Sequence, residues 1–188
     1  KEILDHFPLK ETKKIISNLR SQKTSEKIQI LIVDDGSTDG TSNWLSLQND
    51  LFYLKGNGKL LWGGAVNLGI KYIIKNYSHD DWILILNNDV EVKSDYVESI
   101  LQIAKENYPA AVGSIIKNKK YNQVVSIGPK INTSELKVYD LINFEGEIKG
   151  NEIIKDVDSL SGRGVIYPIC SLKKTNGLRP ILFPHYLA

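Results

Sequence analysis

The sequence predicts an α/β fold with a mostly parallel central sheet flanked by helices. The first observation is a series of short apolar runs, such as 28–33 and 83–86, which hold no internal charge and are typical of strands buried on both faces. The second is that segments with a helical spacing of apolar residues, such as 95–107, stand between these runs. Because strands that alternate with helices are joined by right-handed crossovers, we expect parallel pairing in the first half of the chain.

The length and composition of the chain are typical of one soluble domain. Its 188 residues, 41% of them hydrophobic, are enough to bury one substantial core, so we expect a single domain over 1–188. The net charge is +2, and the lysines are spread along the chain, which gives no case for nucleic acid as a partner. The chain starts at a lysine and has no methionine, so we expect that both ends are incomplete.

The single cysteine and the absence of long apolar runs favour a reducing compartment. Cys170 excludes an internal disulfide, and its apolar neighbours predict a buried, inert thiol in a reducing environment. We find no signal peptide and no membrane span. We therefore expect a cytoplasmic protein, with peripheral association at the cytoplasmic face of a membrane left open.

Six elements are expected in the first half, each from its own local signal. The opening segment has helical spacing with a break at a proline, and the second helix follows turn formers and N-cap residues at 36–41. The first is the opening segment, 1–20, with one or two helices around Pro8. It is followed in order by a strand at 28–33, a helix at 42–48, a strand at 51–54, a helix at 65–76 and a strand at 83–86.

The second half is less regular. A helix at 95–107 is stopped by Pro109, and a short apolar strand follows at 110–116. From 117 to 155 the pattern breaks into short alternating pieces punctuated by glycine and proline, which predicts hairpins or a variable insertion. A last apolar strand is expected at 165–169.

Polar residues follow two of the expected strands at the point where each ends. Asp34 and Asp35 close one strand, and Asn87, Asn88 and Asp89 close another. Ligands of open α/β sheets bind beyond the carboxyl ends of the strands, so we expect both sets to face one crevice. Carboxylate and amide oxygens suit Mg²⁺ or Mn²⁺ holding phosphates. The alternative is that Asn-Asn-Asp is only a polar turn after a strand.

Two adjacent glycines precede the expected helix at 65–76. Gly63 and Gly64 give a backbone that a flat or charged ligand approaches closely at a helix N-terminus. The alternative is that they only permit tight packing of this helix on the sheet.

With these residues in view, the chain resembles family 2 glycosyltransferases of the GT-A fold, in three stretches that occur in order. The third stretch stands where the family has its Asp-x-Asp motif, and the second is similar to the rhamnosyltransferase-like branch. The stretches are Ile32-Val33-Asp34-Asp35-Gly36-Ser37-Thr38-Asp39-Gly40-Thr41, Leu61-Trp62-Gly63-Gly64-Ala65 with Asn67 and Gly69, and Leu84-Ile85-Leu86-Asn87-Asn88-Asp89.

The resemblance implies transfer of a hexosyl or deoxyhexosyl group from a nucleoside diphosphate sugar to a hydroxyl of a glycan, polysaccharide or lipid-linked acceptor, with inversion. Asp34 or Asp35 would hold the nucleobase, and Asp89 would bind Mg²⁺ or Mn²⁺. Residues 1–116 would form the nucleotide-sugar half and 117–188 the acceptor half. The donor-side residues implied are Asp34, Asp35, Gly36, Gly63, Gly64, Asn67, Asn88 and Asp89; those on the acceptor side are Trp62, Arg163 and His185.

The chain departs from the family pattern at two places. We do not find the family's first strand, which precedes the opening helix. Inversion also needs a carboxylate base for the acceptor proton, and in the family this acid follows an aromatic segment like 183–188. We therefore expect the base just beyond Ala188, with His185 as a weaker candidate that also fits a wall of the acceptor site.

Two other readings stay open. A nucleotide-sugar-binding module without catalysis has the same donor residues and differs only in the missing base. A receiver-type signalling domain would share an apolar strand that ends in Asp34 and Asp35, but it would begin with that strand and carry a lysine-proline pair, which this sequence lacks.

Overall fold

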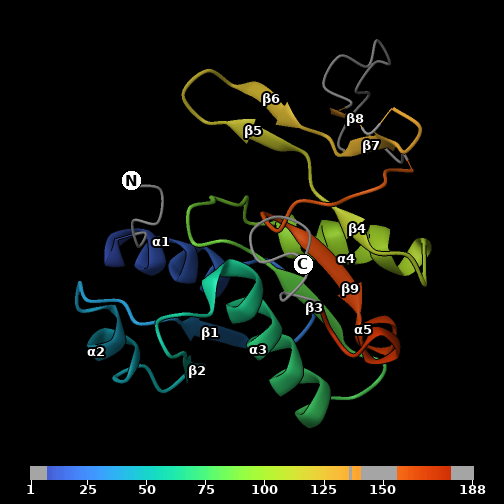
Figure 1. The fold of residues 1–188 in the computed structure, drawn as a ribbon. Coiled ribbons are helices and arrows are strands. Elements are labelled where there is room, and N and C mark those ends of the chain that lie inside the picture. Colours follow the sequence, from blue (N-terminus) through green and yellow to red (C-terminus); the bar gives the residue numbers. More distant parts are fainter. Residues whose placement is uncertain (1–7, 136, 141–155, 179–188) are drawn as a thin grey trace.

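A computed structural model describes residues 8–135, 137–140 and 156–178 of the chain (Figure 1). It is a mixed α/β structure, as expected. The helices are α1 (Leu9–Arg20), α2 (Thr41–Leu45), α3 (Leu61–Asn76), α4 (Tyr96–Glu106) and α5 (Ile169–Thr175). The strands are β1 (Ile30–Asp34), β2 (Leu51–Lys55), β3 (Trp82–Ile85), β4 (Val112–Gly113), β5 (Ile116–Asn118), β6 (Gln123–Ser126), β7 (Pro129–Asn132), β8 (Lys137–Asp140) and β9 (Val165–Pro168).

Strands β1 and β2 form a parallel pair, with Ile30 opposite Leu51 and Asp34 opposite Lys55. Helix α3 packs on this pair through a glycine. A Cβ at Gly69 would lie 3.3 Å from the Val33 side chain, so the small residue lets the helix axis approach the strand closely. The parallel pairing expected for the first half is confirmed for these two strands.

The second sheet is antiparallel, with β9 between β3 and β4. A mostly parallel central sheet is therefore not seen in the described residues, where β1 and β2 are the one parallel pair. The physical reason is the place where the chain returns to the sheet. After β4 the chain forms two hairpins, and β9 then begins beside the end of β4, with Val165 opposite Gly113, so it runs back between β3 and β4 and pairs antiparallel with both (Figure 1).

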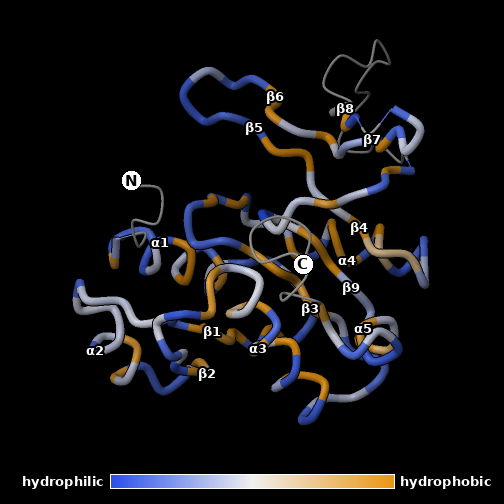
Figure 2. The backbone as a smooth tube through the Cα atoms, in the orientation of Figure 1, coloured by the Kyte–Doolittle hydropathy of each residue, from blue (hydrophilic) through white to orange (hydrophobic). Residues whose placement is uncertain are grey.

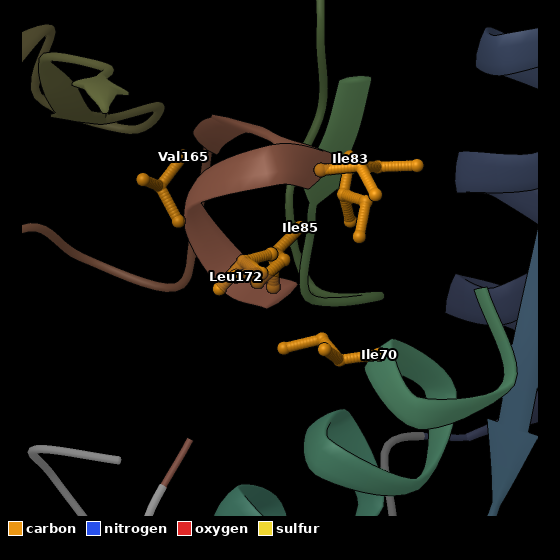
Figure 3. Close-up of a cluster of buried hydrophobic side chains, with 6 residues drawn as sticks. Ile70, Ile83, Ile85, Val165 and Leu172 are labelled. Carbon is orange, nitrogen blue, oxygen red and sulfur yellow. The ribbon is translucent and has the colours of Figure 1, made fainter. Parts of the chain in front are cut away.

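The core lies on both faces of this antiparallel sheet. Alternate residues of β3 and β9 point to opposite faces, as the pleat requires. On one face, α3 and α5 cover Ile83, Ile85 and Val165 (Figure 3), and on the other, α4 packs on Ile166. Burial of these side chains fixes the position of β3, the strand that leads into Asn87-Asn88-Asp89.

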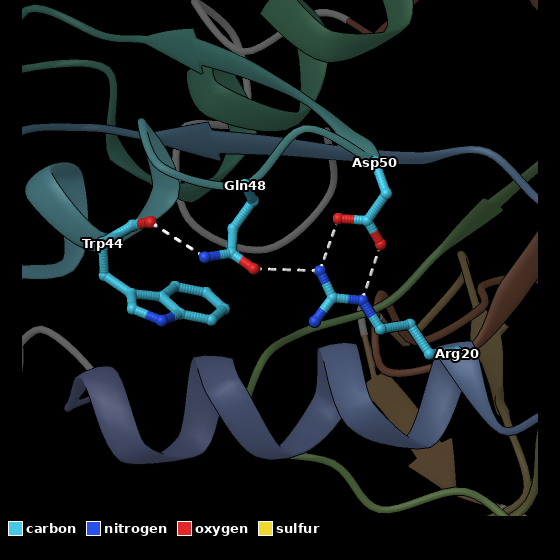
Figure 4. A network of polar contacts seen from close by, with 4 residues as sticks. All are labelled: Arg20, Trp44, Gln48 and Asp50. Atoms are coloured by element: carbon cyan, nitrogen blue, oxygen red, sulfur yellow. Dashed lines mark hydrogen bonds and ion pairs between the residues drawn. The ribbon is translucent and has the colours of Figure 1, made fainter.

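Helix α1 is fastened to the end of α2 by a polar network at its last residue (Figure 4). The guanidinium of Arg20 donates from Nε and Nη2 to the two carboxylate oxygens of Asp50 at 2.7 and 2.6 Å, and from Nη2 to Gln48 at 3.0 Å. Gln48 in turn donates to the backbone oxygen of Trp44 at 3.2 Å. Such a bidentate pair gives a defined geometry, so α1 keeps a fixed place beside the β1–β2 unit.

The sequence did not predict helix α5, which directly follows β9. Pro168 stands at its N-cap and Asn176, in the left-handed region at φ 56°, ends it, so both boundaries have recognisable residues. The burial expected for Cys170 is wrong, because this residue of α5 is half-buried and its Sγ lies 3.4 Å from the Tyr108 hydroxyl. That hydroxyl is the main cause that lowers the pKa of the Cys170 thiol.

Residues 116–140 form an arm of two hairpins, β5–β6 and β7–β8, which projects from the body (Figure 1). The hairpins expected after 117 are confirmed here, and the strand expected at 110–116 is divided into β4 and β5 at the base of the arm. Figure 2 shows a hydrophilic turn between β5 and β6. None of the described helices is long and apolar enough to cross a bilayer.

Candidate functional site

The carboxylate of Asp34 is built into the protein at the end of β1. It is 4% exposed. Its Oδ1 accepts the backbone N–H of Ser37 at 2.9 Å, and its Oδ2 accepts the hydroxyls of Ser42 and, at 3.4 Å, Tyr53. Burial acts to raise the pKa of this carboxyl, and the hydrogen bonds outweigh it, so the pKa lies below its usual value. Asp34 therefore stays ionised and holds the turn after β1.

Asp35 holds the next loop of the chain, 56–60. Its Oδ1 accepts the N–H of Gly58 and its Oδ2 accepts the N–H of Leu60, both at 2.7 Å. Gly56 makes this contact possible, because a Cβ there would lie 2.3 Å from Asp35 Oδ1. Asp35 is only half-buried, so of the two acids it is the one that keeps a surface open to solvent.

Helix α3 begins earlier than expected, at Leu61 and not at Ala65. Gly63 and Gly64 therefore lie in its first turn and do not precede it. Leu61 has φ 55°, a left-handed conformation that is rare for leucine and is typical of strained residues at functional sites. No described side chain caps this helix N-terminus, so its first N–H groups and the positive end of its dipole remain available.

Trp62 joins this helix start to the residues that follow β3. Its indole Nε1 donates to the side-chain oxygen of Asn87 at 2.8 Å. Its ring lies on the backbone of Gly162, where a Cβ would be 2.1 Å from the ring. Since Leu60 is bonded to Asp35, one continuous path of contacts leads from the acid after β1, through the start of α3, to the polar residues after β3.

The side chains of Asn87-Asn88-Asp89 point to three different partners. Asn87 accepts from Trp62, and Asn88 donates to the hydroxyl of Thr12, a buried residue of α1, at 2.9 Å. Asp89 Oδ2 accepts from Arg163 Nη2 at 3.4 Å, while Asp89 Oδ1 is buried and has no hydrogen-bond partner among the described residues. The tripeptide is therefore more than a polar turn, since two of its residues fasten neighbouring elements and the third keeps a buried oxygen free.

The residues fit a divalent cation that is held by one protein carboxylate. The described part of the chain holds no group of three His, Cys, Asp or Glu side chains that could bind a metal ion. The Oδ1 of Asp89, which is buried and has no hydrogen-bond partner among the described residues, is nevertheless a candidate ligand, because a buried carboxylate oxygen without a partner is costly. Mg²⁺ commonly takes one or two protein carboxylates and completes its shell with water and phosphate oxygens.

Asn67 lies on α3 but faces the end of α5. It is 7% exposed, and its side-chain oxygen accepts the N–H of Leu178 at 2.9 Å. Gly177 is needed beside it, since a Cβ there would lie 2.5 Å from that oxygen. This contact gives Asn67 a structural role, and its donor-binding role stays a prediction. His185 and the region of the expected base lie outside the described residues.

Several contacts that shape the site involve residues that the sequence analysis did not single out. A glycine-rich turn at 56–58 was visible in the sequence, but its pairing with Asp35 depends on tertiary structure. Nothing local signals that Thr12 meets Asn88, 76 positions away. Tyr53 and Ser42 likewise reach Asp34 only because β2 and α2 fold back beside β1.

Comparison with known proteins shows the family of the chain. A model of the family described as Glycosyl transferase family 2 matches residues 9–156. A curated relative, the Low-salt glycan biosynthesis hexosyltransferase Agl10 of Haloferax volcanii, is 25% identical over 105 residues, which are 56% of this chain and 33% of that protein. The matching part thus spans about a third of the relative's length. The resemblance noted in the sequence is confirmed at the level of the family.

Proposed function

The chain belongs to glycosyl transferase family 2, and from this premise we propose that it transfers a hexosyl or deoxyhexosyl group from a nucleoside diphosphate sugar to an acceptor hydroxyl, with inversion. The observation that carries the proposal is the path of contacts from Asp35 through Trp62 to Asn87, next to Asp89. It ties two polar strand ends into one site, where a nucleotide with two phosphates could contact both.

Within this site we assign the nucleoside to Asp35. Its carboxylate shares its oxygens with two backbone N–H groups but remains half-exposed, whereas Asp34 is almost fully buried and already accepts three hydrogen bonds. A carboxylate has about four lone-pair directions, so Asp35 retains acceptor capacity for a base N–H. Asp34 then supports the site by fixing the turn at 36–40.

The diphosphate would lie between the N-terminus of α3 and Asp89. The uncapped N–H groups of the helix would attract phosphate oxygens, and the half-buried Gly64 in its first turn places no side chain over that end of the helix. Asp89 would hold Mg²⁺ or Mn²⁺ through its free Oδ1. When bound, this cation supplies charge that stabilises the departing nucleoside diphosphate.

In the reaction, the acceptor oxygen would form a bond to the anomeric carbon as the bond from that carbon to the diphosphate oxygen breaks, and the hydroxyl proton would pass to a base. We assign that base to none of the described residues. The expected acid beyond Ala188, with His185 as the weaker candidate, stays a prediction, and so does an acceptor-side role for Trp62. The relative's name, a glycan biosynthesis hexosyltransferase, supports a glycan acceptor.

The arm at 116–140 favours an acceptor at an anionic surface. It carries five lysines against two acidic residues, while the net charge of the whole chain is +2. Tyr121, Val125, Ile131 and Val138 are exposed on it. Basic side chains next to exposed apolar ones are typical of surfaces that lie on anionic lipid. We therefore propose peripheral contact of this arm with a membrane that holds a lipid-linked acceptor.

A transfer assay with a panel of UDP-, GDP- and dTDP-sugars tests the function. We expect one donor to give product with Mn²⁺, and NMR of the product to show an inverted anomeric configuration. Asp89→Asn should abolish transfer, and Asp80→Asn, an exposed acid before β3, serves as the matched control. Binding of a donor without transfer to any acceptor would favour the non-catalytic module, and retention of configuration would refute the proposed mechanism.

A further inference from the structure

Arg163 is presented to the site by a backbone that is fixed on both sides. On one side, Gly162 is covered by the Trp62 ring. On the other, Gly164 has φ 140° and is buried, and a Cβ there would lie 2.7 Å from the Tyr96 hydroxyl and 2.8 Å from the Ser114 hydroxyl. Neither glycine accepts a side chain without movement. The fold therefore fixes the backbone at Arg163, whereas the arginine side chain is exposed and lies 3.4 Å from Asp89 Oδ2.

The contact between Arg163 and Asp89 is loose. Its one nitrogen-oxygen distance is 3.4 Å, longer than the 2.7–2.9 Å of a charge-assisted hydrogen bond. The Arg163 side chain is 48% exposed and that of Asp89 is 21% exposed. The pair also leaves Asp89 Oδ1 buried and unpartnered. An arginine that served only to neutralise this acid would be expected to reach both oxygens in a bidentate contact.

Resting on the proposed function, we propose that Arg163 is a diphosphate-binding residue that exchanges Asp89 for the donor's phosphate oxygens when a divalent cation binds Asp89. The guanidinium would then share one carboxylate with a second positive charge, so it would be repelled from Asp89. The planar guanidinium matches the geometry of phosphate, and a donor diphosphate adjacent to the cation offers it a new partner. In the absence of donor, Arg163 partly balances the charge of Asp89.

Calorimetry on Arg163→Gln, Arg163→Lys and the parent tests this exchange. The ligands are UDP, GDP and dTDP with Mn²⁺, and the matching nucleosides without phosphate. Lys75→Gln, at the far end of α3, controls for the loss of one exposed positive charge. For the diphosphate that the parent binds, we expect about a tenfold or greater loss of affinity in Arg163→Gln and a smaller loss in Arg163→Lys. Nucleoside affinity should not change.

A second readout is the binding of Mn²⁺ in the absence of nucleotide, which is measured by electron paramagnetic resonance of the free ion. We expect it to be equal or tighter in Arg163→Gln, since a competitor for Asp89 is removed. Unchanged diphosphate affinity, an equal loss for nucleoside and diphosphate, or weaker Mn²⁺ binding would each overturn the inference. If the parent binds a diphosphate and Arg163→Gln binds it equally well, only this inference fails. If the parent binds none of the diphosphates, the proposed function fails too, so the two failures are distinguishable.

Discussion

The indole Nε1 of Trp62 donates a hydrogen bond to Asn87 Oδ1 at 2.8 Å, and this contact joins the first turn of α3 to the residues after β3. Both partners are half-buried. The same ring covers Gly162, next to Arg163. One side chain therefore sets the relative positions of three segments that are distant in the sequence, and its removal should affect the site more than the stability of the fold.

Trp62→Phe should weaken nucleoside diphosphate binding while it lowers the free energy of unfolding only modestly. The change removes one neutral hydrogen bond, worth about 0.5–1.5 kcal/mol, and frees Asn87, while the phenyl ring keeps an aromatic side chain against the core cluster on which Trp62 packs. Chemical denaturation and calorimetry measure the two effects. Trp44→Phe is the matched control, because Trp44 lies on α2 and contacts α1, with Lys13 Nζ 5.2 Å from the centre of its ring. Equal diphosphate affinity in both variants would contradict the role of Trp62.

Asp34→Asn and Asp35→Asn should behave differently although the residues are adjacent. An amide at position 34 can still accept from Ser37 and donate to the hydroxyls of Ser42 and Tyr53, which are able to turn. At position 35, both carboxylate oxygens accept backbone N–H groups, so an amide must place its NH₂ against a donor.

We therefore expect Asp35→Asn to speed hydrogen exchange of the Gly58 and Leu60 amides and to weaken diphosphate binding about tenfold or more. In Asp34→Asn the exchange of these two amides should stay at the parent rate. Exchange followed by NMR, with calorimetry on the same samples, makes the comparison. If both variants keep the parent's affinity for UDP, GDP and dTDP, the acid pair has only a structural role.

Glu91 should give the protein a pH-dependent term in stability. Hydrogen bonds and charge from Lys119 and then Lys14 lower its pKa from 4.5 to about 2 in the folded state. Because the folded pKa is depressed, the stabilisation is complete above the unfolded value and is lost as the pH falls from about 4.5 to about 2. Denaturation at several pH values should show a flatter profile for Glu91→Gln. Superimposable profiles would contradict this.

The arm should bind anionic vesicles. We expect the parent to co-sediment with vesicles of 30% phosphatidylserine in phosphatidylcholine, and to do so less at high salt and little with phosphatidylcholine alone. Lys117→Glu with Lys120→Glu should reduce this binding, whereas Lys71→Glu with Lys75→Glu on α3 should reduce it less. Both control lysines are exposed on the body. Two results would refute the role of the arm: binding that does not depend on lipid charge, or an equal loss of vesicle binding in the two double variants.

Local pattern predicted much of the fold. Apolar runs located β1, β2, β3 and β9 to within a few residues, since burial on both faces leaves a clear signal. The direction of β9 was not predictable, because pairing depends on where the chain returns after the arm. Helix α3 starts at Leu61, four residues earlier than expected, because Gly63 and Gly64 lie within its first turn and do not break it.

For the proposed site, residue type and place at a strand end predicted Asp34, Asp35, Asn88 and Asp89 together. Sequence alone could not separate the roles that we propose for Asp35 and Asp89 from those of the other two. The separation comes from partners. Asp34 accepts from three residues around it, and Asn88 reaches Thr12 on a different element. Such pairings depend on the final packing. A pattern of polar residues at strand ends therefore predicts where the site lies, but not which residue binds ligand and which holds the structure.

The central claim is that Asp89 holds a divalent cation on which donor binding depends. Calorimetry of the preferred nucleoside diphosphate sugar, with parent and Asp89→Ala, each with Mn²⁺ and with chelator, tests it most directly. We predict tight binding only for the parent with Mn²⁺, and equally weak binding in the other three mixtures, since the free Oδ1 of Asp89 supplies the protein ligand. Equal donor affinity in all four mixtures would contradict the claim.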